Sequence, residues 1–230
     1  MNRRERILLT GFGPFPGVRE NATSKLVPEI AARAEQLNWN VQIAVDVLPV
    51  GWRDGPDRAR QLIEQFDPAV VLHFGVSEAA SGFVIETRAE NICKPRPDAA
   101  GELPRLELLD LEGAADKACT IPCAAIVSRL RENGLPAELS EDAGGYLCNA
   151  VLLDTLARAR PGLRAGFIHV PTYLAADSRP MTMADAVRGG LQIVHACLDQ
   201  EILGDEVQRE VAPTPTGPRR SQAWTASRIT

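Results

Sequence analysis

Residues 69–74 read AVVLHF, five apolar side chains and one histidine without a break. A short apolar run of this kind is typical of a strand that is covered on both faces, because a strand with one exposed face would alternate apolar and polar residues. Such strands occupy parallel sheets, whose crossover connections place helices on both faces. The run therefore predicts the interior of an α/β sheet.

Strands and helices alternate on both sides of this run. Apolar or β-branched segments predict further strands at residues 6–10, 41–50, 83–92, 137–140 and 164–170. Segments with a helical period predict helices at residues 23–37, 53–66, 121–133, 146–159 and 183–203. Thr23 is the expected N-cap of the first helix, and residues 95–115 are expected to form a loop. The alternation predicts an α/β sheet with helices on both faces.

Composition and charge restrict the possible classes of protein. The chain has 230 residues, of which 45% are hydrophobic, and a formal net charge of −5. Basic residues do not cluster, so nucleic acid is not an expected partner. The apolar run at residues 7–9 is too short for a signal peptide and no segment reaches membrane-spanning length, so we expect a cytoplasmic protein without a membrane partner. Residues 1–203 are expected to form one domain, and the proline-rich residues 204–230 a flexible tail.

The cysteines give little support for a structural metal or a disulfide framework. The chain contains five of them, which are Cys93, Cys119, Cys123, Cys148 and Cys197. An odd number without a signal peptide argues against disulfides. The pair Cys119 and Cys123 suggests a metal site, but it lacks a second ligand pair at a familiar spacing, and the chain has only three histidines. We therefore expect no structural metal.

A candidate nucleophile precedes an apolar helical segment. Cys148 follows Gly144 and Gly145, which permit a tight turn directly before the predicted helix. Unpaired N–H groups in a first helical turn favour an anionic sulfur and could hold a developing oxyanion. A cysteine beside an apolar helix is also commonly a small buried hydrophobic residue. The local pattern leaves both interpretations open.

One histidine and one glutamate could complete a catalytic group. His169 lies at the end of a predicted strand, where functional side chains gather in open α/β sheets, and imidazole suits general-base chemistry near neutral pH. Glu86 lies in an apolar predicted strand, and either orients the histidine as the third member of a triad or faces solvent. His73 and His195 lie within apolar segments and are interpreted as structural.

A loop rich in glycine and proline follows the first predicted strand, at residues 11–17. Phe12 and Phe15 in this loop either cover the core or line an apolar slot for a flat ligand. The loop lacks the lysine and the spacing of a phosphate-binding P-loop.

Over residues 6–203 the sequence resembles the pyroglutamyl peptidase type I family, also called the pyrrolidone-carboxylate peptidases. Four segments carry most of the resemblance to family motifs. They are residues 8–15 (LLTGFGPF) for TGFEPFGG, residues 85–91 (IETRAEN) for IERxAxN, residues 143–149 (AGGYLCN) for SAGxYxCN and residues 166–171 (GFIHVP) for GFIHVP. The segments HFGV at residues 73–76 and LPV at residues 48–50 are similar to further family segments.

The resemblance implies a three-layer α/β/α sandwich around a mixed, mostly parallel sheet of the phosphorylase/hydrolase-like type. It also implies an enzyme without a cofactor and often a homo-oligomer. The catalytic residues that it implies are Glu86, Cys148 and His169. The substrate-binding residues that it implies are Phe12, Phe15, Asn21 and Arg96.

Several positions depart from the family pattern. Gly13 replaces the glutamate of the opening signature, Pro16 replaces its first glycine, and Ala22 replaces the proline that follows Asn21. Residues 76–82 (VSEAASG) lack the family's glycine-glycine-arginine pattern. These changes border the expected substrate pocket and leave the three catalytic positions intact.

The expected function is hydrolysis of the amide bond after an N-terminal pyroglutamyl residue. Cys148 would attack the carbonyl, His169 would transfer the proton, Glu86 would hold His169, and Phe12 and Phe15 would clamp the lactam ring. The altered loops leave a second hypothesis, a thiol amidohydrolase that acts on another small cyclic or N-acyl amide. A third hypothesis is a non-catalytic binding protein with the same fold, against which the intact triad argues.

Overall fold

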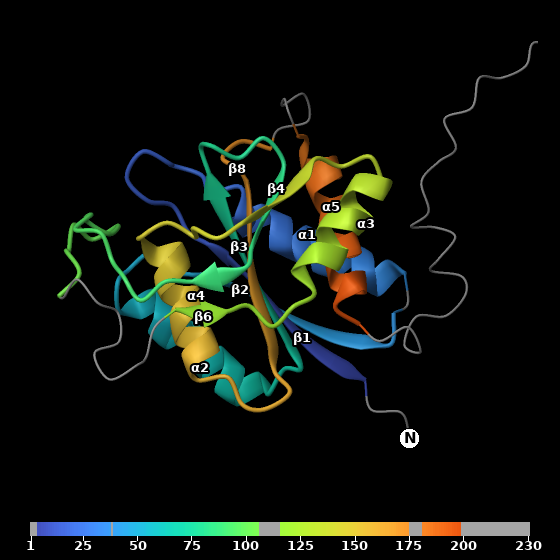
Figure 1. Cartoon of the computed structure of the whole chain (residues 1–230), viewed down its shortest axis with the longest axis horizontal. Coiled ribbons are helices and arrows are strands. Elements are labelled where there is room, and N and C mark those ends of the chain that lie inside the picture. The colour runs from blue at the N-terminus through green and yellow to red at the C-terminus, as the bar shows by residue number, and fades with distance from the viewer. Residues whose placement is uncertain (1–3, 38, 106–115, 175–180, 199–230) are drawn as a thin grey trace, which may run out of the picture.

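The structure is a computed structural model that describes residues 4–37, 39–105, 116–174 and 181–198. Six strands of the described chain form one sheet in the order β2-β1-β3-β8-β4-β7 (Figure 1). These strands are β1 (Glu5–Phe12), β2 (Val41–Leu48), β3 (Val70–Ser77), β4 (Phe83–Glu86), β7 (Ala137–Ser140) and β8 (Arg164–Pro171). A separate antiparallel pair consists of β5 (Arg88–Ala89) and β6 (Lys117–Ala118).

The main sheet is mixed and mostly parallel. Strands β2, β1, β3 and β8 run parallel, β4 is antiparallel to β8, and the edge strand β7 is parallel to β4. Strand β3 holds the apolar run and is buried from Val70 to Gly75, as its sequence predicts. Because β1, β3 and β8 point the same way, their carboxyl ends meet at one edge of the sheet.

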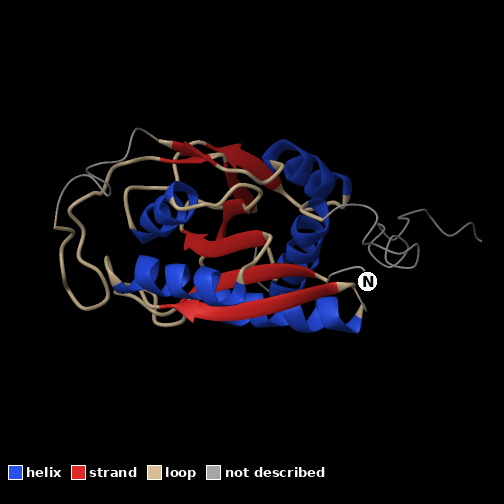
Figure 2. Ribbon diagram, turned by 90° about the horizontal axis from the view of Figure 1, so that it is seen from below, coloured by secondary structure: helices blue, strands red, loops and turns tan. Residues whose placement is uncertain are grey.

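Helices cover both faces of the sheet (Figure 2). One face carries α1 (Thr23–Gln36), α3 (Cys123–Glu132) and α5 (Met183–Ala196), and the other carries α2 (Asp54–Phe66) and α4 (Leu147–Ala157). Each face has its own apolar core, in which Ile30 of α1 and Ile193 of α5 belong to the first and Val151 of α4 to the second. The predicted three-layer α/β/α sandwich is confirmed.

The start of α1 differs from the sequence prediction. The N-cap position is Ala22, and Thr23 is the first helical residue. The side-chain oxygen of Asn21 accepts hydrogen bonds from the backbone N–H and the hydroxyl of Thr23, while that hydroxyl accepts one from the N–H of Phe12. The prediction of Thr23 as the N-cap was wrong because Asn21, two residues earlier, satisfies the first free N–H group of the helix.

Other element boundaries also shift. The predicted strand at residues 83–92 is divided at Thr87, whose N–H bonds to Ser140 and whose carbonyl accepts from Cys119, so the chain leaves the main sheet there. Helix α5 ends at Ala196, earlier than predicted, and the short strand β6 was not predicted. Residues 95–105 form a loop as predicted, whereas residues 106–115 and the predicted tail at residues 204–230 lie outside the described residues. In the described part of the chain, no helix combines the length and the apolar character needed to cross a bilayer.

Candidate active site

A cavity of about 540 Å³ opens at the carboxyl ends of the parallel strands. It is lined by residues near the ends of three strands, which are Phe12 of β1, Gly75 of β3 and His169 of β8. Ligand sites in open α/β sheets gather at this edge. The cavity wall contains every site residue that the sequence predicts, namely Phe12, Phe15, Asn21, Glu86, Arg96, Cys148 and His169.

The turn with two glycines directs Cys148 to the cavity. Gly144 has a φ of +73°, a left-handed conformation that other residues rarely adopt, and the chain then enters α4 at Leu147. Cys148 is the second residue of this helix, as predicted, and Tyr146 at the N-cap is extended and makes no capping hydrogen bond through its side chain. The N–H groups of a first helical turn have no acceptor within the helix. They can therefore stabilise negative charge beside the sulfur.

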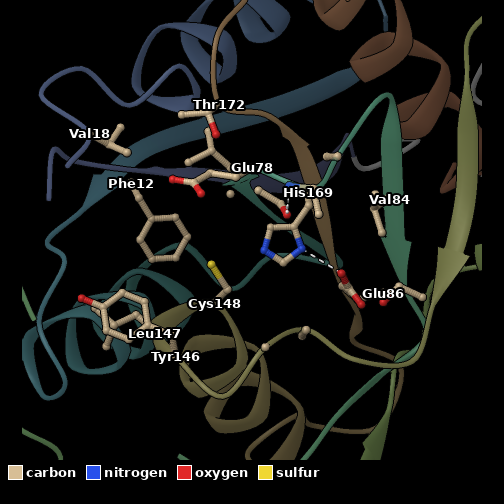
Figure 3. Close-up of a pocket in the computed structure, with 18 of the residues that line it drawn as sticks. Phe12, Val18, Glu78, Val84, Glu86, Tyr146, Leu147, Cys148, His169 and Thr172 are labelled. Atoms are coloured by element: carbon tan, nitrogen blue, oxygen red, sulfur yellow. Dashed lines mark hydrogen bonds and ion pairs between the residues drawn. The ribbon is translucent and has the colours of Figure 1, made fainter. Parts of the chain in front are cut away.

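His169 and Glu86 come from neighbouring antiparallel strands. Nδ1 of His169 lies 2.7 Å from Oε1 of Glu86, and the two residues are 7% and 1% exposed. Register pairs Glu86 with Phe167, two residues before His169, so both functional side chains project from the same face. In Figure 3 the Cys148 sulfur lies beside the His169 ring, on the side away from Glu86, and the Cys148 side chain interacts with this ring. The structure thus brings the three residues together, and the alternative of a solvent-facing Glu86 is wrong.

Opposing effects act on the pKa of His169. Burial by itself lowers the pKa, but the charge on a Cys148 thiolate and the interactions with Cys148 and Glu86 raise it to about 10. The raised pKa favours the protonated imidazole at neutral pH. A thiolate–imidazolium pair is the reactive form of a cysteine nucleophile.

A close approach at Gly75 sets the position of the sulfur. A Cβ atom at this residue would lie 2.7 Å from Cζ of Phe167 and 3.1 Å from Sγ of Cys148. The ring of Phe167 in turn lies 4.8 Å, centroid to centroid, from the ring of His169. Only a residue without a side chain fits between the nucleophile and this aromatic support.

We expect Gly75→Ala to destabilise the protein by about 1–3 kcal/mol, the usual cost of overpacking, and to lower kcat at least about tenfold because Cys148 must move. Thermal unfolding and amide hydrolysis would measure the two effects. Gly51→Ala is the matched control, because the nearest atom to its new Cβ is at 3.4 Å. Wild-type kcat in Gly75→Ala would contradict the expectation.

The first loop supplies an aromatic wall. The ring of Phe12 lies 6.0 Å from that of Phe167, and Phe12 is 3% exposed. Phe15 is half-buried and forms a bridge with Val18, which folds the loop over the cavity. Asn21 lies in the same wall, where its side-chain amide donates a hydrogen bond to the carbonyl of Gly13 in the loop. Phe12 thus packs in the core and also lines the cavity.

Arg96 is held at the cavity by aromatic side chains. Its guanidinium lies 4.7 Å from the ring centroid of Tyr146, and its carbonyl accepts a 2.9 Å hydrogen bond from Nε1 of Trp52. The rings of Tyr146 and Trp52 meet edge to face at 5.3 Å. Arg96 therefore lies on the side of the cavity that Tyr146 forms.

Asn149, next to the nucleophile, connects α4 to the segment that follows Glu86. Its side chain accepts a 2.8 Å hydrogen bond from the N–H of Glu90 and donates to the carbonyls of Glu90 and Ile92, at 2.7 and 3.1 Å. The residue is 1% exposed. These bonds fix Cys148 relative to Glu86, and the sequence motif alone does not show this role.

The other two histidines are structural, as predicted. His73 is fully buried between the hydroxyls of Thr10 and Thr155, at 2.6 and 3.0 Å, and burial lowers its pKa to about 3. Burial also lowers the pKa of His195, to about 4, and its ring packs against Trp39. Neither side chain lines the cavity.

The cysteine pair that suggested a metal lies behind the site. The thiol of Cys123 is 3.6 Å from the carbonyl of Glu86, and Cys119 is half-buried nearby. All five cysteines are free thiols. Among the described residues, no group of three or more His, Cys, Asp or Glu side chains is arranged to hold a metal ion.

Some lining residues were not found from the sequence. Val84, Glu138 and Thr172 face the cavity, and the hydroxyl of Thr172 is buried without a hydrogen-bond partner. Glu78, from the segment that departs from the family pattern, projects into the cavity between Phe12 and Thr172 (Figure 3). Only Glu78 had a signal in the sequence, namely the departure from the family pattern at residues 76–82. The positions of Val84 and Glu138 depend on strand pairing, which the sequence does not show.

Comparison with known proteins agrees with this geometry. A sequence model of the pyroglutamyl peptidase family matches residues 5–200. The pyrrolidone-carboxylate peptidase of Pseudomonas fluorescens is 34% identical over 211 residues, 87% of this chain and 98% of that protein. That of Thermococcus litoralis is 34% identical over 171 residues, 73% of this chain and 76% of that protein.

Solved structures are similar as well. The crystal structure of pyroglutamyl peptidase I from Bacillus amyloliquefaciens has a TM-score of 0.75 at 26% identity and covers 84% of this chain and 96% of its own. The pyrrolidone carboxyl peptidase from Thermococcus litoralis has a TM-score of 0.74 at 27% identity, with coverage of 93% and 99%.

Proposed function

The chain belongs to the pyroglutamyl peptidase family, and from this membership we propose that it hydrolyses the amide bond after an N-terminal pyroglutamyl residue of a peptide. The observation that carries the proposal is the convergence of Cys148, His169 and Glu86 in one cavity, with His169 and Glu86 2.7 Å apart. A thiol, an imidazole and a buried carboxylate in this order form a nucleophile, a proton carrier and its support.

In the proposed acylation step, the thiolate of Cys148 attacks the carbonyl carbon of the pyroglutamyl residue. The oxygen gains negative charge, which the N–H groups at the start of α4 stabilise. His169 gives its proton to the amide nitrogen, the C–N bond breaks, and the peptide leaves with a free amino group. The pyroglutamyl group remains bound to Cys148 as a thioester.

Deacylation uses the same residues, but His169 now accepts a proton where it donated one before. Neutral His169 removes a proton from water, and the resulting hydroxide attacks the thioester carbonyl. The C–S bond breaks, pyroglutamate leaves, and the thiolate–imidazolium pair forms again. Glu86 accepts the hydrogen bond of Nδ1 throughout, which keeps Nε2 directed at the reacting atoms.

The apolar wall of the cavity suits an uncharged five-membered ring. Phe12 and Phe15 offer flat faces to the lactam, and Asn21 and Arg96 are the polar side chains proposed to contact it. An ordinary N-terminal residue would place a charged amine against the rings of Phe12 and Phe15, which is costly. The proposed specificity thus follows from what the wall excludes.

A comparison of reporter amides tests the function. We expect kcat/KM for a pyroglutamyl amide to exceed that for the prolyl amide, which has the same ring size but a charged amine and no lactam carbonyl, by at least about 10²-fold. Alanyl, N-acetylalanyl and other cyclic-acyl amides complete the set. Faster hydrolysis of an N-acyl or another cyclic amide would favour the amidohydrolase hypothesis, and no turnover of any amide would favour a binding protein.

A further inference from the structure

We propose that Glu138 forms a subsite for a cationic side chain on the residue that follows the pyroglutamyl group, so that the enzyme prefers lysine or arginine there. Because this subsite belongs to the cavity described above, the proposal rests on the proposed function. It assigns a specificity-determining role to Glu138 on the edge strand β7.

A row of side chains crosses the sheet from His169 to Glu138. Val84 on β4 pairs with His169 on β8, and the same Val84 pairs with Glu138 on β7. Directly paired residues project from the same face of a sheet. Since neighbouring strands are about 4.8 Å apart, Glu138 lies roughly 10 Å across the sheet from His169. Its neighbour Leu139 points to the other face, where it is 48% exposed.

This row lies on the leaving-group side of the cavity. Figure 3 shows Phe12 on one side of Cys148 and His169, and Val84 on the other. With the lactam ring held on the Phe12 side and the scissile carbonyl at the sulfur, the amine that His169 protonates departs toward Val84. The residue after the pyroglutamyl group therefore lies over Val84, with Glu138 beyond it.

Val84 and Glu138 together suit a long cationic side chain. Val84 is half-buried and provides an apolar floor for a methylene stem. Glu138 is exposed, and its carboxylate makes no hydrogen bond or ion pair with any described residue. An ammonium or guanidinium group at the end of that stem would form an ion pair with this carboxylate without displacing another side chain. The lactam carries no charge, so charge selection can act only on this part of the substrate.

The positively charged side chain in the described wall lies away from Glu138. Oε2 of Glu86 is buried without a hydrogen-bond partner, while Oε1 faces His169. Arg96 is the one Lys or Arg among the described lining residues, and it lies over Tyr146, which Figure 3 shows on the side of Phe12. Glu78 adds a negative charge on the side of Phe12, the side on which Arg96 also lies, whereas Glu138 has no Lys or Arg near it among the described lining residues.

Two matched peptides test the subsite: pyroglutamyl-lysyl-alanine amide and the same peptide with Nε-acetyl-lysine, which keeps the stem and removes the charge. We expect the wild type to prefer the lysyl peptide about two- to fivefold in kcat/KM at low salt, the range of a partly exposed ion pair. The ratio should approach one in Glu138→Gln, and it should also fall as salt is added.

Glu132→Gln is the control, because it removes one negative charge from the exposed surface of α3, away from the cavity. This variant should keep the wild-type ratio. A wild-type ratio of one would overturn the subsite while leaving pyroglutamyl hydrolysis established, and so would a preference that survives in Glu138→Gln. Hydrolysis of neither peptide by the wild type would instead overturn the proposed function, and the subsite with it.

Discussion

Replacement of Cys148 by alanine is expected to lower kcat for a pyroglutamyl amide by at least about 10⁴-fold, because removal of a catalytic nucleophile leaves only the binding and oxyanion contributions. Cys148 is the one cysteine among the described residues that line the cavity. Cys148→Ser is expected to be almost as inactive, since a hydroxyl beside an imidazolium has no counterpart of the thiolate charge.

Cys197→Ala is the matched control, because this thiol is 1% exposed at the end of α5 and does not line the cavity. It should retain wild-type kcat, even if the lost packing lowers the melting temperature. Circular dichroism and thermal unfolding would confirm that Cys148→Ala is folded. More than about a tenth of wild-type activity in folded Cys148→Ala would rule out the thioester mechanism.

His169→Ala is expected to lower kcat/KM by about 10²- to 10⁴-fold, the usual contribution of a general acid–base.

The dependence of wild-type kcat/KM on pH tests the protonation state of His169. The pKa of His169 is raised to about 10, and the protonated form is the one that delivers a proton to the leaving amine. We therefore expect kcat/KM to persist through pH 8–9 and to fall as the pH rises through about 10.

Glu86→Gln separates charge from shape at this pair. Glutamine keeps the length of the side chain but removes the negative charge that, after the interactions with Cys148, helps to raise the pKa of His169. The alkaline limb of the kcat/KM profile should therefore move to lower pH, with a loss of at least about tenfold at neutral pH. An unchanged alkaline limb in Glu86→Gln would show that the carboxylate does not act on His169 in the free enzyme.

Local sequence patterns predict much of the architecture. The apolar run at residues 69–74 and its alternation with helical segments predict a covered sheet, because burial on both faces requires apolar residues at successive positions. The turn before Cys148 is also local, since Gly144 has a positive φ and the helix begins at Leu147. The ends of helices are harder to predict from the sequence, because more than one neighbouring side chain can accept from the free N–H groups. At the start of α1 the acceptor is Asn21 and not Thr23.

Local patterns of apolar residues were sufficient to predict the fold class, because burial on both faces of a sheet is visible in successive residues. The resemblance of short motifs, and not their local physics, implied the family and the three residues proposed for catalysis. Which of these groups meet depends instead on how the strands pair. The pairing of β4 with β8 places Glu86 under His169 and Val84 beside it, and the pairing of β7 with β4 adds Glu138 to the wall. Strand pairing joins segments that are distant in sequence, and a shift of one residue would turn each of these side chains to the other face.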